Sequence, residues 1–216
     1  MANIYTIDNI RLNRKGLQSQ DADGKWVDLH CQQGRLDGAC AVYSTIMALL
    51  CIGYIKEEDI DIWKKKDPDR RTLKGRLLSH LLEEQGLIRD GYYLKDMASE
   101  LQNALRDYKV EHISKPNCIY EAKEYIEAGY PVIVQVGNNN FCHAILAIGT
   151  EYEPEDEKLL KLFCLDPGFD KPLHSYWNCV IDTSRKNTGE FPYWYITDET
   201  HTSKIEIKEI ITIEER

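Results

Sequence analysis

The stretch QQGRLDGACAVYSTIMALLCIG, residues 32–53, decides how the rest of the chain is interpreted. From Asp37 onward its apolar residues recur at steps of three and four, which predicts a helix with one buried face. The residues of this pattern are Ala39, Val42, Tyr43, Ile46, Met47 and Leu50. Asp37 is a suitable N-cap and Gly53 a suitable stop, so Cys40 lies in the first turn. A helix N-terminus favours the thiolate, the nucleophilic form of cysteine.

The rest of the chain divides into helical and strand-like regions. Residues 1–30 are expected to form a β-hairpin or two short edge strands, with the turn at Asp23-Gly24. Apolar spacing predicts further helices at residues 57–63, 73–86, 94–108 and 117–129. After Pro131 it predicts strands at residues 131–137, 142–152, 158–166, 193–197 and 204–214, the last with a bulge at Ile210.

This order of elements predicts the fold class. We expect one α+β domain over residues 1–216, with N-terminal strands at 1–30, a helical half at about 37–129 and a β half at about 131–214. With 43% hydrophobic residues, the chain can bury a substantial core.

Composition and charge limit the function classes. The 36 acidic and 27 basic residues give a net charge of −9, which argues against nucleic acid or an anionic membrane as a partner. No apolar run approaches the ~18 residues that span a bilayer. The first residues lack the pattern of a secretory signal. We therefore expect a cytoplasmic protein, or one exported by a route that needs no signal.

The seven cysteines are scattered and include no CxxC pair. Because an odd number at irregular spacing does not suit a disulfide framework, we expect reduced thiols. Cys142 is expected on the face of its strand opposite to His143. Cys142, Cys164 and His174 could be imagined as zinc ligands, but their spacing fits no common metal pattern. We expect no metal and no cofactor.

A histidine and an aspartate are expected to meet across a β-hairpin. Strands 142–152 and 158–166 flank an acidic turn at Pro154-Glu155. If they pair antiparallel about this turn, His143 lies opposite Asp166, within hydrogen-bonding reach. A carboxylate in this position sets the tautomer and orientation of a catalytic imidazole. A slip of one residue would place the two side chains on opposite faces.

A nucleophilic cysteine also needs donors for the oxyanion that forms on its substrate. The Cys40 backbone N–H at the helix start is one such donor. A glutamine amide a few residues upstream is a natural second, and Gln32 and Gln33 both qualify. A nucleophile from the helical half and a base from the β half would meet in a cleft between two lobes.

Three segments resemble a known family. QGRLDGACAVYS, residues 33–44, resembles the active-site segment of papain-like cysteine peptidases. FCHAILAIG and FCLDPG, residues 141–149 and 163–168, are more similar to the bacterial branch that removes double-glycine leaders from bacteriocins. The order Gln, Cys, His, Asp agrees with that family over most of residues 32–170. The resemblance implies a papain-like fold, in which a helical lobe with the nucleophile helix packs against a C-terminal antiparallel sheet lobe.

The resemblance also implies the roles of four residues. Cys40 would be the nucleophile, His143 the base, Asp166 the orienting acid and Gln33 the oxyanion donor. Two departures weaken the match: six residues separate Gln33 from Cys40, one more than is usual in the family, and Ala41 stands where papain has tryptophan. The implied activity is a cysteine-dependent hydrolase that cleaves a peptide or isopeptide bond of a protein through a thioester.

Other functions stay open at this point. The same residues can catalyse deamidation or transglutamination. Alternatively, the chain could be a papain-like module without catalytic activity that only binds a partner. A regulatory partner protein is also open. Lysine- and arginine-rich residues 64–76 could dock an acidic partner or a phosphate, although a solvated loop and helix start explains them more simply. The aromatic segments at 175–181 and 191–197 could line a substrate groove or pack a sheet face.

Overall fold

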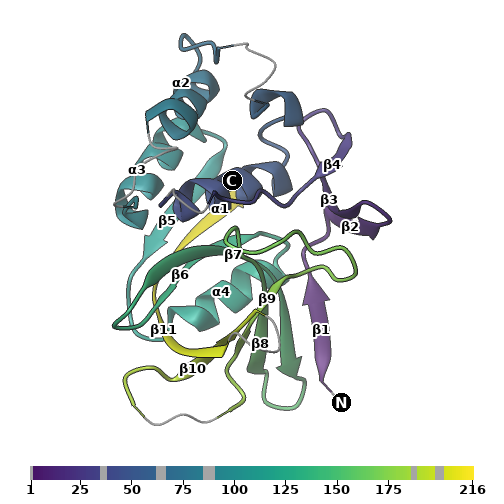
Figure 1. The fold of residues 1–216 in the computed structure, drawn as a ribbon, viewed down its shortest axis with the longest axis vertical. Coiled ribbons are helices and arrows are strands. Elements are labelled where there is room, and N and C mark those ends of the chain that lie inside the picture. The colour runs from purple at the N-terminus through teal and green to yellow at the C-terminus, as the bar shows by residue number, and fades with distance from the viewer. Residues whose placement is uncertain (1, 35–37, 62–66, 85–90, 186–188, 198–201) are drawn as a thin grey trace.

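The computed structural model describes the chain except for residues 1, 35–37, 62–66, 85–90, 186–188 and 198–201. At its centre six antiparallel strands form a closed barrel (Figure 1). They follow one another around the barrel in chain order, and the pairing of β11 with β6 closes the ring. Their bounds are β6 (Val132–Gly137), β7 (Cys142–Glu153), β8 (Lys158–Leu165), β9 (Cys179–Asp182), β10 (Tyr193–Ile196) and β11 (Thr202–Glu215).

Two barrel strands are long enough to take extra partners. β7 has 12 residues and also pairs with β1 (Asn3–Thr6). β11 has 14 residues and also pairs with β5 (Tyr108–Ile113). A separate three-stranded sheet contains β2 (Ile10–Asn13), β3 (Gly16–Gln20) and β4 (Trp26–Asp28).

Four short α-helices lie in the described part of the chain: α1 (Cys40–Cys51), α2 (Leu73–Ser79), α3 (Leu94–Ala104) and α4 (Cys118–Glu127). A 3-10 turn, η1 (Glu57–Asp59), precedes α2, and a π-helical turn, η3 (His80–Glu84), follows it. Both α1 and α4 pack against β7. Residues 144–150 of β7 are therefore buried without a break, as expected of a strand that is covered on both faces.

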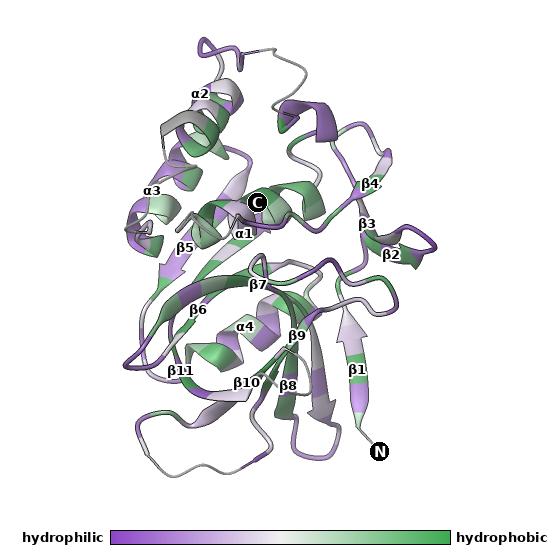
Figure 2. Ribbon diagram, viewed as in Figure 1, coloured by the Kyte–Doolittle hydropathy of each residue, from purple (hydrophilic) through white to green (hydrophobic). Residues whose placement is uncertain are grey.

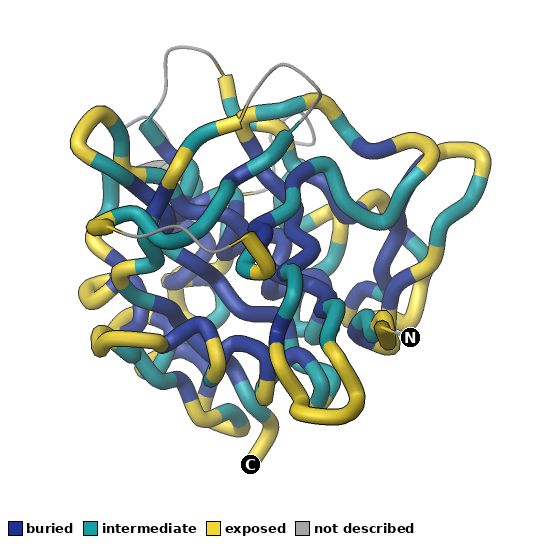
Figure 3. Tube along the Cα trace, turned by 90° about the horizontal axis from the view of Figure 1, so that it is seen from below, coloured by how far each residue is buried: buried dark blue, intermediate teal, exposed yellow. Residues whose placement is uncertain are grey.

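The hydrophobic core joins α1 to the barrel. Figure 2 shows apolar residues along α1 and the central strands, whereas polar residues lie mostly on the surrounding loops and turns. The core contains buried residues of α1 and of the barrel strands, and Figure 3 shows that buried residues occupy the interior of the chain trace and exposed ones its outer loops. In the described part of the chain, no helix has both the length and the apolar character needed to cross a membrane.

The predicted α+β, papain-like fold with two facing lobes is wrong. The chain is mostly β, with 24% of its residues in helices, and its sheet closes into a barrel instead of forming one wall of a second lobe. Closure depends on the pairing of β6 with β11, which joins residues far apart in sequence. Alternating apolar residues predict that a strand forms, but they do not predict which strand it pairs with.

Several elements were predicted correctly. The helix at Cys40 is confirmed as α1, and Gly53 follows its end with a φ of +65°. The N-cap of α1 is Ala39, and the predicted N-cap Asp37 lies outside the described residues. The end predicted at residue 86 for the helix over 73–86 lies outside them too. The helix predicted for residues 94–108 ends at Ala104 instead, and Tyr108 begins β5.

The N-terminal and C-terminal strand predictions hold in part. The turn at Asp23-Gly24 joins β3 to β4, whereas β1 pairs with the distant β7. β11 does contain an irregularity, but the shift of register lies between Ile207 and Glu209 and not at Ile210.

Candidate active site

Cys40 is the first residue of α1, and its position is set by contacts with β7. Its Sγ accepts a hydrogen bond from the Ala144 backbone N–H at 3.4 Å. One turn later, the Ser44 hydroxyl donates to the Ala144 carbonyl at 3.0 Å. Residues four apart lie on one helix face, so the two side chains attach the same face of α1 to one residue of the barrel.

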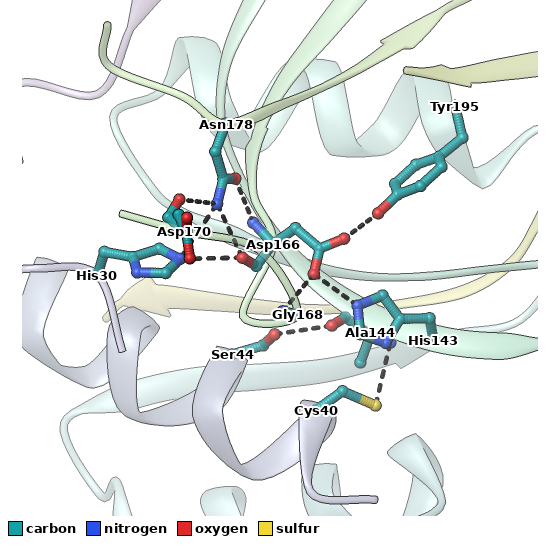
Figure 4. A network of polar contacts seen from close by, with 10 residues as sticks. All are labelled: His30, Cys40, Ser44, His143, Ala144, Asp166, Gly168, Asp170, Asn178 and Tyr195. Atoms are coloured by element: carbon teal, nitrogen blue, oxygen red, sulfur yellow. Dashed lines mark hydrogen bonds and ion pairs between the residues drawn. The ribbon is translucent and has the colours of Figure 1, made fainter. Parts of the chain in front are cut away.

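The structure brings Cys40, His143 and Asp166 together in one chain of hydrogen bonds (Figure 4). One ring nitrogen of His143, Nε2, lies 2.7 Å from Asp166 Oδ1. The other ring nitrogen interacts with the Cys40 sulfur. The imidazole thus bridges a thiol and a carboxylate, the order that nucleophilic cysteine chemistry needs.

The His143–Asp166 contact was predicted from a register that the structure does not have. Near the site Leu146 pairs with Leu165, and the ladder between β7 and β8 contains two irregularities. His143 lies three residues before Leu146, and Asp166 lies one residue after Leu165, so they are not opposed in the ladder. Continuing the pairing of Leu146 with Leu165 would place Asp166 opposite Ile145, two residues from His143 on the same face of β7, so the contact is a diagonal one. The Gly168 N–H also donates to Asp166 Oδ1, at 2.6 Å.

Gly168 is tightly confined against the pair. A Cβ atom at this residue would lie 3.0 Å from Asp166 Oδ1 and 3.7 Å from His143 Nε2. The absence of a side chain lets the turn fold onto the carboxylate and the imidazole.

Asp166 is fully buried, and its carboxylate, its backbone N–H and its backbone carbonyl all form hydrogen bonds. Tyr195 on β10 donates its hydroxyl to Asp166 Oδ2. Asn178 accepts from the Asp166 N–H at 2.7 Å and donates to the Asp166 carbonyl at 2.9 Å. His30 Nε2 also lies 2.9 Å from that carbonyl. Tyr195 thus holds the carboxylate, and Asn178 and His30 hold the backbone of the same residue.

The pKa values follow from these contacts. Burial opposes ionisation of Cys40 and would raise the pKa of its thiol. The hydrogen bond and charge of His143, together with the Ala144 and Ala41 amides, outweigh burial and lower the pKa of Cys40. Burial likewise opposes charge on His143, yet Asp166 and Cys40 raise its pKa to about 10. For Asp166, the hydrogen bond and charge of His143 outweigh burial and lower the pKa. The contacts therefore shift each group toward its charged form: Cys40 toward the thiolate, His143 toward the imidazolium and Asp166 toward the carboxylate.

A cavity of about 210 Å³ opens beside the cysteine. Its walls include Cys40, His143, Gln135, Tyr92 and Tyr93. Tyr93 is 80% exposed, so the cavity has an aromatic edge that is available to a ligand. The cavity gives a second molecule access to the sulfur.

The described contacts of the two candidate glutamines do not include Cys40. The Gln33 backbone N–H donates to the Pro167 carbonyl at 2.8 Å, and its side-chain Oε1 is buried without a described partner. Gln33 lines a different cavity, next to Gly168. The Gln32 amide donates to Asp170 Oδ1 at 3.0 Å. Residues 35–37, which connect Gln33 to Cys40, lie outside the described residues. Gln33 as oxyanion donor stays a prediction.

The other cysteines differ from Cys40 in environment. Burial raises the pKa of Cys31 to about 12 and raises those of Cys118 and Cys142 as well. Cys142 lines the same cavity as Cys40 and His143. It lies on the face of β7 that Ala144 and its partner Gln135 share, and in an alternating strand this is the face opposite to His143, as expected. Cys164 is buried, and the described residues contain no group of three or more metal-ligating side chains placed to hold an ion. In the basic segment, Arg71 pairs with Asp69.

Sequence reasoning missed the residues around Asp166. Asp-Pro-Gly is a signal for an Asx turn, in which the aspartate side chain binds the N–H two residues on, and this is the contact to Gly168. Tyr195 belongs to an aromatic segment that was noted only as a groove or a packing face. His30 and Asn178 lie 136 and 12 residues from Asp166 in sequence and carry no local signal.

Tyr195→Phe is expected to weaken the site without removing any of the three central residues. The change leaves Oδ2 of a buried carboxylate without its donor, which costs ~1–3 kcal/mol of unfolding free energy. The Tyr195 hydrogen bond lowers the pKa of Asp166, so its loss brings this pKa closer to the ordinary value. When the solution is acidified, the variant therefore loses the stabilising contribution of Asp166 at a higher pH than the native protein does. Urea unfolding at pH 7 and acid titration measure both effects. Tyr193→Phe on the same strand is the control, and equal shifts in the two variants would contradict the expectation.

No family model and no curated protein sequence matches this chain.

Proposed function

We propose that this chain is a cysteine-dependent hydrolase that cleaves a peptide or isopeptide bond in a protein substrate. The observation that carries the proposal is the continuous contact from Cys40 through His143 to the buried Asp166. A buried ion pair is costly to maintain for stability alone. Its placement beside a thiol with a lowered pKa, in an accessible cavity, favours a catalytic role.

The proposed reaction begins with attack of the Cys40 thiolate on a substrate carbonyl. The carbonyl oxygen becomes an oxyanion, for which backbone N–H groups in the first turn of α1 are suitable donors. His143 then gives its proton to the leaving amine, and the acyl group stays on Cys40 as a thioester. His143 next takes a proton from water, which hydrolyses the thioester and restores the thiolate. Asp166 stays ionised and holds the imidazole in position.

The resemblance to papain-like peptidases supports this proposal only through the local segments around Cys40, His143 and Asp166. The fold is not part of the support, because the chain forms a closed barrel. The cavity edge formed by Tyr92 and Tyr93 suits an extended peptide, which can lay its backbone and side chains against aromatic rings.

The test is alkylation with iodoacetamide near pH 6, followed by mass-spectrometric mapping of the labelled residues. We expect Cys40 to react at least about tenfold faster than Cys142, because only the thiolate reacts and Cys142 has a raised pKa. Cys142 is the matched comparison because it lines the same cavity and is more exposed. If Cys142 reacts as fast as Cys40, the proposal fails.

The reaction type is read from product masses after incubation with a mixture of unmodified peptides. Cleavage divides a peptide and adds one water across the two products. Deamidation leaves the chain intact and replaces an amide nitrogen by oxygen, and transfer to an amine joins two substrates. Intact peptides throughout, in the presence of a reactive Cys40, would overturn cleavage as the activity on such chains.

A further inference from the structure

Cys142 lies beside the nucleophile but has no part in the proposed reaction. Of the seven cysteines, all of which lie in the described part of the chain, it alone is exposed. It lines the same cavity of about 210 Å³ as Cys40. The Cys40 sulfur contacts the N–H of Ala144, two residues along β7 from Cys142. Two thiols on adjoining elements thus open into one small space.

A hydrogen bond fixes the second sulfur at this cavity. Gln135 on β6 donates its side-chain amide to Cys142 Sγ at 2.6 Å, and Gln135 lines the cavity too. This contact is possible because β6 and β7 pair with Gln135 opposite Ala144, which places Gln135 and Cys142 on the same face of the sheet.

We infer that Cys142 is a modification site of this cavity, where it forms a reversible disulfide with Cys40 after a hydroperoxide has oxidised Cys40. The inference shares with the proposed function the need for a Cys40 thiolate. It goes further in stating that, without substrate and with hydroperoxide present, this thiolate is oxidised and then protected as a disulfide.

The chemistry balances with hydrogen peroxide as the oxidant. The Cys40 thiolate attacks one peroxide oxygen, the O–O bond breaks, and His143 supplies the proton that releases water, which leaves Cys40 as a sulfenic acid. The Cys142 sulfur then attacks the Cys40 sulfur. The S–S bond forms, the S–O bond breaks, and the hydroxide leaves as water with the thiol proton of Cys142. Two thiols are oxidised by two electrons in total, and one peroxide is reduced to two waters.

The remaining cysteines are less suited to this role. Cys51, Cys118, Cys164 and Cys179 are buried. Cys31 is partly exposed, but it does not belong to the described lining of the cavity, and burial raises its pKa to about 12. An exposed thiol in the same cavity reaches the sulfenic acid without unfolding of the core.

The experiment exposes the full chain to a small excess of hydrogen peroxide and then maps its cysteines by mass spectrometry. In the native protein we expect a Cys40–Cys142 disulfide, a loss of iodoacetamide labelling at Cys40, and recovery of that labelling with dithiothreitol. In Cys142→Ser we expect at least about tenfold more Cys40 in the sulfinic or sulfonic state, which dithiothreitol does not reverse. Cys31→Ser is the matched control and is expected to behave as the native protein.

The outcomes separate this inference from the proposed function. Alkylation of Cys40 is first measured without peroxide. If Cys40 is reactive but oxidation is the same in the native protein and in Cys142→Ser, the inference fails and the proposed function stands. If Cys40 is unreactive from the start, both fail. A disulfide between Cys142 and any cysteine other than Cys40 also overturns the inference. Cys142→Ala, checked for native circular dichroism, guards against an effect of the serine hydroxyl.

Discussion

In the His143→Ala variant, alkylation of Cys40 near pH 6 is expected to slow by about a hundredfold or more. The lowered pKa of Cys40 depends chiefly on the hydrogen bond and charge of His143, which outweigh the effect of burial. Without the imidazolium, burial raises the pKa of the thiol above its ordinary ~8.5, so that at pH 6 fewer than about one thiol in a hundred is ionised.

The pH profile gives this prediction a second measure. In the native protein the reactive pair is the thiolate with the imidazolium, which forms above the lowered pKa of Cys40. The imidazolium is lost when the pH rises through about 10, the pKa of His143. The variant is expected to become reactive only as the pH approaches that of an ordinary thiol. A native rate that rises only near pH 8 or 9, as in the variant, would show that Cys40 and His143 do not form a charged pair.

His112→Ala is the matched control for this experiment. His112 is also a partly buried histidine paired with a carboxylate, that of Glu209. It lies on β5 and does not contact Cys40. Its replacement removes a histidine–carboxylate pair and is expected to leave the rate at Cys40 within about twofold of the native value, because neither His112 nor Glu209 belongs to the described lining of the Cys40 cavity or to the groups that shift the pKa of Cys40.

Replacement of Asp166 is expected to have the largest effect on both stability and reactivity. Asp166→Asn leaves a buried His143 without its counter-charge, and removal of one partner of a buried ion pair costs ~3–5 kcal/mol of unfolding free energy. The same change allows the wrong imidazole tautomer, which lowers the catalytic rate by ~10⁴ in Ser-His-Asp triads. Urea unfolding at pH 7 and the alkylation rate of Cys40 measure the two effects.

The pH dependence of stability gives the sign of each contribution. The pKa of Asp166 is lowered on folding, so its contribution is present above the ordinary value of 3.8 and is lost as the pH falls through the lowered pKa. The pKa of His143 is raised, so its contribution is present below the ordinary value of 6.5 and is lost as the pH rises through about 10. Asp166→Asn is expected to flatten both limbs of the stability profile.

Asp182→Asn separates stability from reactivity. Asp182 is also buried and charged; it accepts from the Ser184 N–H at 2.9 Å and pairs with Arg185 at 3.1 Å. The change is expected to lower stability without slowing alkylation of Cys40. If Asp166→Asn destabilises the chain no more than Asp182→Asn and leaves the rate at Cys40 unchanged, Asp166 has no role in orienting His143.

Those features of the candidate site that depend on short segments could be predicted from the sequence. Cys40 at the start of α1 followed from the apolar spacing of residues 39–50, because a helix has a fixed period. The meeting of His143 and Asp166 was predicted, but for a reason that the structure does not bear out. The β7–β8 hairpin turns between Glu153 and Lys158, so its register differs from the predicted one. Asp166 reaches His143 from just beyond the pair Leu146 and Leu165.

The surroundings of that contact depend on non-local pairing. Tyr195 reaches Asp166 because β10 joins β9, which in turn joins β8. His30 reaches the same residue from the N-terminal segment. No spacing between these residues in the chain indicates their contact, since it arises only when the barrel has closed.

The sequence by itself determined that Cys40 lies near the start of a helix and that most of the barrel strands follow Pro131, and it indicated Cys40, His143 and Asp166 as the candidate site. These features depend on periodicity and residue type within short segments. The sequence did not predict β5 or β9. The tertiary structure alone decided that the strands close into a barrel, that Tyr195, Asn178 and His30 hold Asp166, and that Cys142 shares the cavity of Cys40. Strand pairing and burial depend on contacts between residues that are distant in sequence. The free energy of these contacts depends on the whole folded chain, so no single segment predicts them.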